Sequence, residues 1–165
     1  MSGLAKTTFI FTVLLSGCSA AQQSAYNAGN IEGFNHTEYS ISDFNINGAM
    51  GSTSGTVCCA MIPKKWTPEL RAKISWSTIN TKGLAPPPNF NKVDDFNKWE
   101  QQVKDRTQNH EAIVPIAQYD KSCGLQVHFL PCNEVKVVSS CYWYGMPEYP
   151  IQAPKNMKEP TVCPK

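Results

Sequence analysis

The stretch that most constrains the fold is residues 55–78, GTVCCAMIPKKWTPELRAKISWST, which predicts two strands joined by a turn between Pro63 and Pro68. In residues 71–78 apolar and polar side chains alternate, the pattern of a strand with one solvated face. Residues 57–62 carry apolar side chains on both faces, so we expect a central strand there. Proline lacks an amide donor, which places both prolines where strand pairing stops.

Two adjacent cysteines, Cys58 and Cys59, lie within the first of these strands. Successive side chains of a strand point to opposite faces of the sheet. We therefore expect these cysteines to form disulfides with two different partners rather than with each other, which would hold the strand from both sides.

Length and charge narrow the class of protein. A chain of 165 residues has room for one domain. Its formal net charge is +2, and no stretch gathers lysine and arginine into the basic face that a nucleic-acid interface requires. The sequence therefore argues against a nucleic-acid partner.

The N-terminus has the organisation of a secretory signal. Lys6 precedes an apolar run, residues 9–15, that is too short to span a bilayer. The run ends in Leu-Ser-Gly-Cys, which resembles the lipobox of bacterial lipoproteins, in which the cysteine is acylated and becomes the new N-terminus. We expect residues 1–17 to be a signal peptide and Cys18 to be lipidated. The alternative is a soluble secreted protein cleaved at a small-residue site.

The lipobox resemblance also implies a location. Several acyl chains on Cys18 would anchor the protein stably. In enteric-type lipoproteins a residue other than aspartate after the cysteine implies the outer membrane, and Ser19 stands there. We therefore expect a periplasm-facing, lipid-anchored protein of the bacterial outer membrane. Residues 18–30 are polar and predict a flexible tether, which leaves residues 31–165 as one globular domain with a proline-rich C-terminal tail.

Six cysteines remain beyond Cys18, and an even number in an oxidising compartment predicts disulfides. Residues 125–130 and 135–140 predict a hairpin. Its expected register brings Cys123 and Cys141 within one residue of direct opposition, so a bulge would let them bond. The sequence leaves open the partners of four cysteines, although Cys163 is placed to hold the tail: Cys58, Cys59, Cys132 and Cys163.

One helix is predicted, with Asn91 as its N-cap. Acidic residues in its first turn and basic residues near its end match the helix dipole. It has an apolar stripe that we expect to pack on the sheet. The predicted fold is therefore α+β: a mainly antiparallel β-sheet with one packed amphipathic helix, braced by disulfides. The stripe consists of Val93, Phe96, Trp99 and Val103.

No catalytic or metal-binding constellation emerges from the residues. The cysteines lack the paired spacing of zinc sites. The three histidines, His36, His110 and His128, stand in no nucleophile motif, and His128 falls on the polar face of its strand, so surface or structural roles are favoured. We expect no enzyme activity, no cofactor, no metal and no small-molecule substrate.

A partner-binding surface is indicated by Tyr142, Trp143 and Tyr144, at the end of the predicted hairpin. Tyrosine and tryptophan are enriched in protein interfaces because they bring large contact areas at low entropy cost. The alternative is that these rings cover the core beneath the proline-rich tail.

Several short motifs together resemble a family of small bacterial lipoproteins, domain of unknown function 3304. The motifs include Asn-His-Thr at residues 35–37, Cys-Cys at 58–59, Pro-x-x-Trp at 63–66 and Val-His-Phe-Leu-Pro at 127–131. The resemblance covers about residues 31–150. Members of this and similar lipoprotein groups are often encoded beside type VI secretion lipase effectors, which implies an immunity or accessory role. The family has no established active site, so no catalytic residues carry over.

The expected function is that of a membrane-anchored periplasmic lipoprotein that binds and neutralises a phospholipase-type effector of type VI secretion. An inhibitor needs a rigid surface with aromatic anchors, which disulfides would provide. The alternative is a structural or assembly lipoprotein of the envelope without a toxin partner. The expected partners are thus the membrane, through the N-terminal lipid, and a secreted effector protein whose identity the sequence leaves open.

Overall fold

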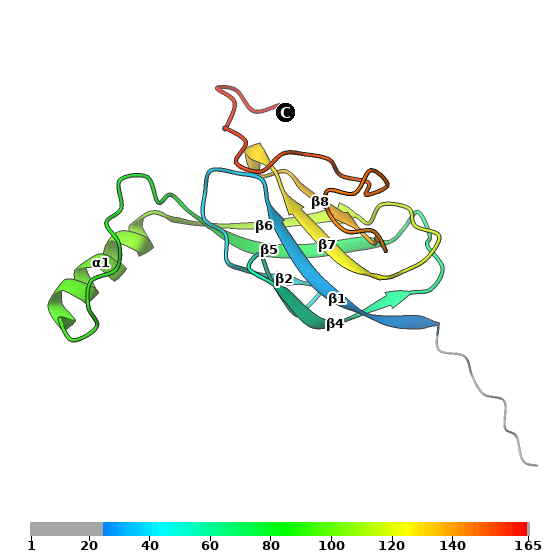
Figure 1. Ribbon diagram of the computed structural model, residues 1–165, viewed down its shortest axis with the longest axis horizontal. Coiled ribbons are helices and arrows are strands. Elements are labelled where there is room, and N and C mark those ends of the chain that lie inside the picture. The colour runs from blue at the N-terminus through cyan, green and yellow to red at the C-terminus, as the bar shows by residue number, and fades with distance from the viewer. Residues whose placement is uncertain (1–24, 165) are drawn as a thin grey trace, which may run out of the picture.

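The computed structural model describes residues 25–164, which form two four-stranded sheets and one helix (Figure 1). The strand orders are β4-β1-β7-β8 and β3-β2-β5-β6, and within these sheets only β1 and β7 pair in parallel. The predicted α+β class, mainly antiparallel, is confirmed. The elements are β1 (Tyr26–Asn35), β2 (Asp43–Ile46), β3 (Ala49–Ser52), β4 (Thr56–Pro63), β5 (Arg71–Ile79), α1 (Val93–Asp105), β6 (Thr107–Pro115), β7 (Gly124–Phe129), a 3-10 turn (Pro131–Asn133) and β8 (Val135–Val138).

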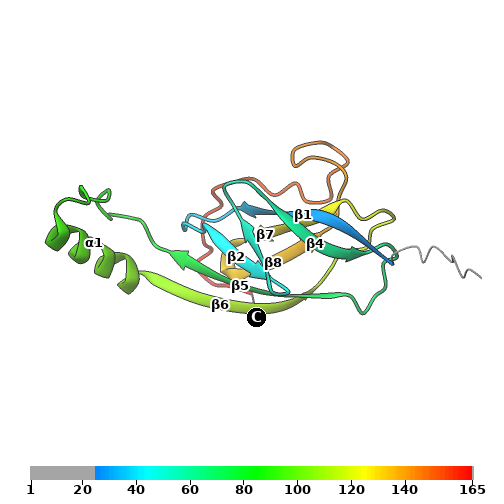
Figure 2. The same ribbon diagram turned by 90° about the horizontal axis from the view of Figure 1, so that it is seen from below.

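The core lies between the two sheets, which form separate layers in Figure 2. Alternate side chains of each strand point inward, as the pleat of a strand requires. Phe129 of β7 meets Phe44 of β2 edge-on, with ring centroids 5.2 Å apart, and lies 5.6 Å from Trp76 of β5. These aromatic contacts join the two layers.

The strands predicted in residues 55–78 both form, but they belong to different sheets. The expectation of a central strand at residues 57–62 is wrong, because β4 is an edge strand. Ala60 and Ile62 are buried, whereas Met61, on the opposite face, is 62% exposed. An apolar side chain does not by itself require burial, so a strand that is apolar on both faces can still occupy an edge.

Strand β1 begins at Tyr26, within the segment that we expected to be a flexible tether. Its first residues pair with β4, from Tyr26 opposite Pro63 to Gly29 opposite Ala60. Backbone pairing satisfies the amide groups without apolar side chains, so a polar sequence can extend a strand. The predicted signal peptide, residues 1–17, and the predicted lipidation site, Cys18, lie outside the described residues. Within residues 25–164, no helix is both long and apolar enough to cross a membrane.

Helix α1 forms where the sequence predicts one, but it does not pack on a sheet. None of its side chains is buried, and Figure 1 shows it beyond the far ends of β5 and β6. Its aromatic residues contact the preceding loop instead: the Phe96 ring lies 4.9 Å from that of Phe90, and Trp99 Nε1 donates to the Ala85 carbonyl at 2.8 Å. The second sheet already closes the core, so no apolar sheet face remains for the helix. The N-cap is Lys92 rather than Asn91.

The C-terminal tail, residues 146–164, covers the outer face of β1 and β7. Tyr149 is only 2% exposed, and the backbone N–H of Met157 donates to the His36 carbonyl at 2.6 Å. A disulfide between Cys132 and Cys163 ties the end of the tail to the turn after β7. Strand β7, in the middle of this sheet, is therefore covered on both faces for most of its length.

Replacing Gly51 by alanine is expected to lower the free energy of unfolding by about 2 kcal/mol. Strand β3 passes so close to the core that a Cβ atom at Gly51 would overlap the Phe44 ring and Cγ2 of Ile31, both of which are buried. Urea denaturation measures the change. Gly55→Ala is the matched control, since nothing lies within 4 Å of a Cβ added there. Equal stabilities of the two variants would contradict this packing.

Candidate functional site

A pocket of about 330 Å³ lies on the outer face of the sheet that contains β1 and β7. The two strands contribute side chains that alternate with the core residues, and residues 140–144, called here the aromatic loop, contribute most of the rest. The pocket therefore combines polar and aromatic groups from segments far apart in the sequence. Its lining consists of Asn30, Glu32, Phe34, Thr56, Cys123, Gly124, Gln126, Ser140, Cys141, Tyr142, Trp143, Tyr144 and Tyr149.

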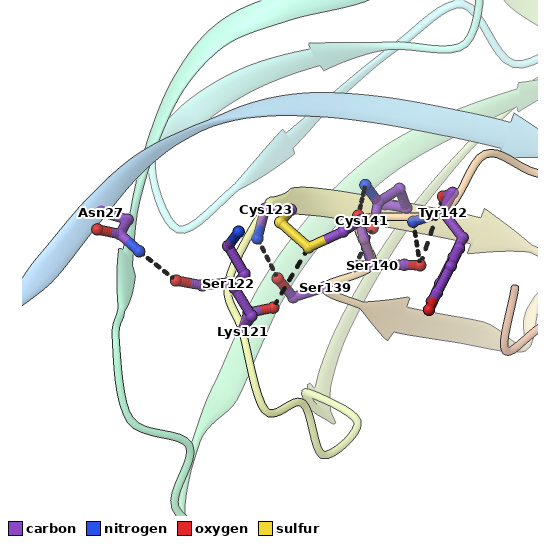
Figure 3. Close-up of a disulfide and its surroundings, with 9 residues drawn as sticks. Asn27, Lys121, Ser122, Cys123, Ser139, Ser140, Cys141 and Tyr142 are labelled. Carbon is purple, nitrogen blue, oxygen red and sulfur yellow. Dashed lines mark hydrogen bonds between the residues drawn. A yellow bond between two sulfur atoms is a disulfide. The ribbon is translucent and has the colours of Figure 1, made fainter. Parts of the chain in front are cut away.

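A disulfide between Cys123 and Cys141 fixes the start of the aromatic loop (Figure 3). The hairpin of β7 and β8 forms, but its register differs by one residue from the predicted one, since Phe129 pairs with Val135. The reason is that the Leu130 N–H bonds to the Glu134 carbonyl at 2.8 Å. Continued past β8, this register places the two cysteines directly opposite each other, and their Cα atoms lie 5.1 Å apart.

Hydrogen bonds hold the aromatic loop against β7 as well. The Ser140 N–H donates to Gln126 Oε1 at 2.9 Å, and Gln126 Nε2 donates back to the Ser140 carbonyl at 3.2 Å. The N–H of Tyr142 donates to Ser140 Oγ at 3.1 Å, as Figure 3 shows. The loop is thus presented in a fixed conformation, which lowers the entropy cost of binding through it.

Of the three predicted interface residues, two are exposed and one covers the core beneath the tail. Trp143 is 75% exposed and Tyr142 is 50% exposed, so both are available to a partner. Tyr144 is partly buried against Phe34, with ring centroids 4.9 Å apart, and its hydroxyl donates to the Ala153 carbonyl. Tyr144 therefore packs beneath the tail, whereas the other two rings face solvent.

The remaining cysteines form two bonds. Cys58 and Cys59 are joined to each other, contrary to the expectation of two different partners. Both are exposed on the edge strand β4, and the other four cysteines of residues 25–164 are bonded in pairs to each other. The Cys132–Cys163 pair has Glu159 nearby, which accepts a hydrogen bond from the Cys132 N–H at 2.8 Å. The sulfur atoms of this group are bonded to each other and so are not free to act as thiolate ligands.

Two buried histidines, His36 and His128, and the hydroxyl of Tyr149 form a hydrogen-bonded chain beside the pocket. His36 and His128 are each 0% exposed, and the distance between His36 Nε2 and His128 Nδ1 is 2.8 Å. His128 was expected on a solvated strand face; the tail covers that face, so this expectation is wrong. The third histidine, His110, lies on the other sheet, stacked on Trp76 and bonded to Thr78 Oγ1 at 2.8 Å.

The direction of the hydrogen bonds in this chain follows from the carbonyl at its end. The Pro154 carbonyl can only accept, so neutral His36 donates from Nδ1, at 3.0 Å. His36 Nε2 then accepts from His128 Nδ1, and His128 Nε2 accepts from the Tyr149 hydroxyl at 2.7 Å. Each group therefore has one defined role, and the chain connects β1, β7 and the tail.

Burial keeps all three groups of this chain neutral. Burial, together with the nearby charges of His36 and Lys136 in their protonated forms, lowers the pKa of His128 to about 3. Burial also lowers the pKa of His36, and burial aided by the Glu32 carboxylate raises the pKa of Tyr149. The chain thus holds the tail through neutral hydrogen bonds.

Nothing in the sequence marks Glu32, Gln126 or the role of His128, which bonds to Tyr149 of the pocket lining. Glu32 and Gln126 looked like ordinary solvated residues of strands. Their place opposite each other in the parallel pairing of β1 and β7 brings them to one pocket. The Asn-His-Thr motif was the signal that could have drawn attention to His36, because a histidine directly after a strand end can bond to a neighbouring strand.

Comparison with known proteins identifies the family of this chain. No curated protein and no solved structure matches this chain. A family model described as "Protein of unknown function (DUF3304)" matches residues 34–137. This range runs from the end of β1 into β8 and so includes strands of both sheets. The chain therefore belongs to the DUF3304 family, as its short motifs predicted.

Proposed function

We propose that this protein is a lipid-anchored lipoprotein of the bacterial outer membrane that captures and neutralises a phospholipase-type effector of type VI secretion. The observation that supports it most is the aromatic loop, where Trp143 and Tyr142 line a pocket and remain exposed. A disulfide and the paired hydrogen bonds of Gln126 and Ser140 hold this loop. Rigid aromatic anchors are what tight protein inhibitors use.

The proposed anchor would keep the domain close to lipid. Cys18 stands eight positions before Tyr26, where β1 begins. An extended chain of this length reaches about 28 Å. A lipidated Cys18 would thus hold the domain near the membrane surface, where a phospholipase must act. An inhibitor held there would meet its target at the substrate.

The test is capture of the effector by the soluble, oxidised form, residues 19–165. The secreted protein encoded beside its gene would be mixed with this form, and its hydrolysis of phospholipid vesicles would be followed. The proposal predicts a one-to-one complex and loss of lipase activity. If no complex forms and the full-length lipoprotein is instead retained on native envelope complexes, the alternative of a structural or assembly lipoprotein replaces it.

Trp143→Ala is expected to weaken effector binding by at least 30-fold, about 2 kcal/mol, because buried tryptophans at interfaces are frequent hot spots. Titration calorimetry measures the affinity. Phe90→Ala is the matched control, since Phe90 is also 75% exposed but lies beside α1. Loss of binding in the Phe90 variant alone would move the interface to the α1 end of the molecule.

A further inference from the structure

The pocket beside the aromatic loop places one carboxylate among aromatic rings. Glu32 lies in β1, between Thr56 of β4 and Gln126 of β7. It lines the pocket together with the rings of Phe34 and Trp143. Aromatic faces carry negative potential, and the carboxylate adds a full negative charge. The two features together favour a cation.

No protein cation neutralises Glu32 in residues 25–164. The ion pairs in this part of the chain join Lys73 to Glu111 and Lys136 to Glu134. No lysine or arginine lines the pocket. Lys155 lies with Glu32 on a neighbouring pocket, but its Nζ sits over the Tyr144 ring, 5.9 Å from the centroid.

The polar neighbour of Glu32 on β7, Gln126, is also occupied. Both ends of the Gln126 amide are bonded to the Ser140 backbone. The Nε2 and Oε1 atoms of Gln126 are therefore both hydrogen-bonded, and the orientation of the amide is fixed. The unpaired charge in the pocket is thus that of Glu32, open to a donor that arrives from outside.

We propose that this pocket receives the guanidinium group of an arginine side chain of the captured protein, an inference that rests on the proposed function. A guanidinium is planar, so it stacks on aromatic rings, and its fork of N–H donors matches a carboxylate. A quaternary ammonium would leave the Glu32 oxygens without a donor. A lysine ammonium is more strongly hydrated and cannot stack.

The test uses N-acetyl-arginine amide as the probe, titrated into the soluble oxidised protein. The indole N–H signal of Trp143, assigned with Trp143→Phe, reports binding by NMR. We expect a saturable shift with the arginine probe and at least tenfold weaker binding of the neutral isostere N-acetyl-citrulline amide. Glu32→Gln should weaken binding of the arginine probe at least tenfold. Glu148→Gln is the matched control, because Glu148 is exposed and outside the pocket, and should leave binding unchanged.

Three outcomes would overturn the inference. Equal binding of the citrulline probe would remove the role of charge, and equal effects of the Glu32 and Glu148 variants would remove the role of this carboxylate. Tighter binding of tetramethylammonium than of the arginine probe would assign the pocket to a lipid head group. The probe assay contains no effector, so the two proposals can fail separately. If the effector is captured but the arginine probe does not bind, the pocket does not receive an arginine, and the proposed function stands. If the probe binds but no effector is captured, the pocket accepts a guanidinium, and the proposed function is wrong.

Discussion

Replacing His128 by alanine lowers the free energy of unfolding by about 4 kcal/mol. The imidazole is fully buried, and its removal leaves His36 Nε2 and the Tyr149 hydroxyl without partners. It also leaves a cavity beneath the tail. Urea denaturation at pH 7.5 measures the loss. A change below 1 kcal/mol would contradict the buried hydrogen-bonded chain.

The same histidine makes the protein sensitive to acid. At pH 7.5 and above, His128 is almost wholly neutral in both the folded and unfolded states. Below that pH the unfolded chain takes up a proton that the folded protein, with a pKa of about 3, does not. Stability is therefore lost as the pH falls from about 6.5 toward 3, by about 2 kcal/mol at pH 5 from His128 alone. The lowered pKa of His36 acts in the same direction.

His128→Phe separates titration from the loss of volume, since phenylalanine is somewhat larger than histidine, leaves no cavity and does not titrate. The decrease in stability between pH 7.5 and pH 5 should be about 2 kcal/mol smaller in this variant than in the unaltered protein. The comparison remains possible if the alanine variant fails to fold. Parallel pH profiles of the two proteins would show that His128 is not held neutral by burial.

Replacing Cys123 and Cys141 together by serine lowers the free energy of unfolding by about 3 kcal/mol. The bond joins residues 18 positions apart, so its loss frees a long loop in the unfolded chain. It also releases the start of the aromatic loop, and we expect effector affinity to fall by about tenfold. Thermal unfolding and titration calorimetry measure the two effects.

The matched control for this disulfide is the double replacement of Cys58 and Cys59 by serine. These residues are adjacent, so their bond closes almost no loop, and both are exposed on an edge strand. By the chain-entropy argument the change in stability should be about 1 kcal/mol, well below the change for the longer bond. A loss as large as that of the Cys123 and Cys141 variant would show that loop closure is not what the longer bond contributes.

Local patterns predicted the elements better than their arrangement. Alternation located β5, and the turn residues located the hairpin of β7 and β8. The apolar stripe of α1 showed that the helix needs a cover but not which segment supplies it, and the preceding loop does so. Likewise, the alternation around Cys58 and Cys59 says nothing of whether a cysteine stands on either side of the strand.

Only part of the candidate site could be predicted from the sequence, for a similar reason. Tyr142 and Trp143 are adjacent in the sequence, so a cluster of aromatic residues was enough to predict a binding surface there. His36, His128 and Tyr149 are far apart, and their chain depends on the parallel pairing of β1 with β7 and on the path of the tail. Such long-range pairing leaves no periodic trace in the sequence.

Hydrogen–deuterium exchange of the complex with the secreted phospholipase tests most directly whether the pocket is the capture surface. We expect backbone amides of residues 140–146 to gain protection when the effector binds, and those of residues 90–105 around α1 to remain unchanged. Protection confined to the α1 region, or the absence of any complex, would contradict this expectation.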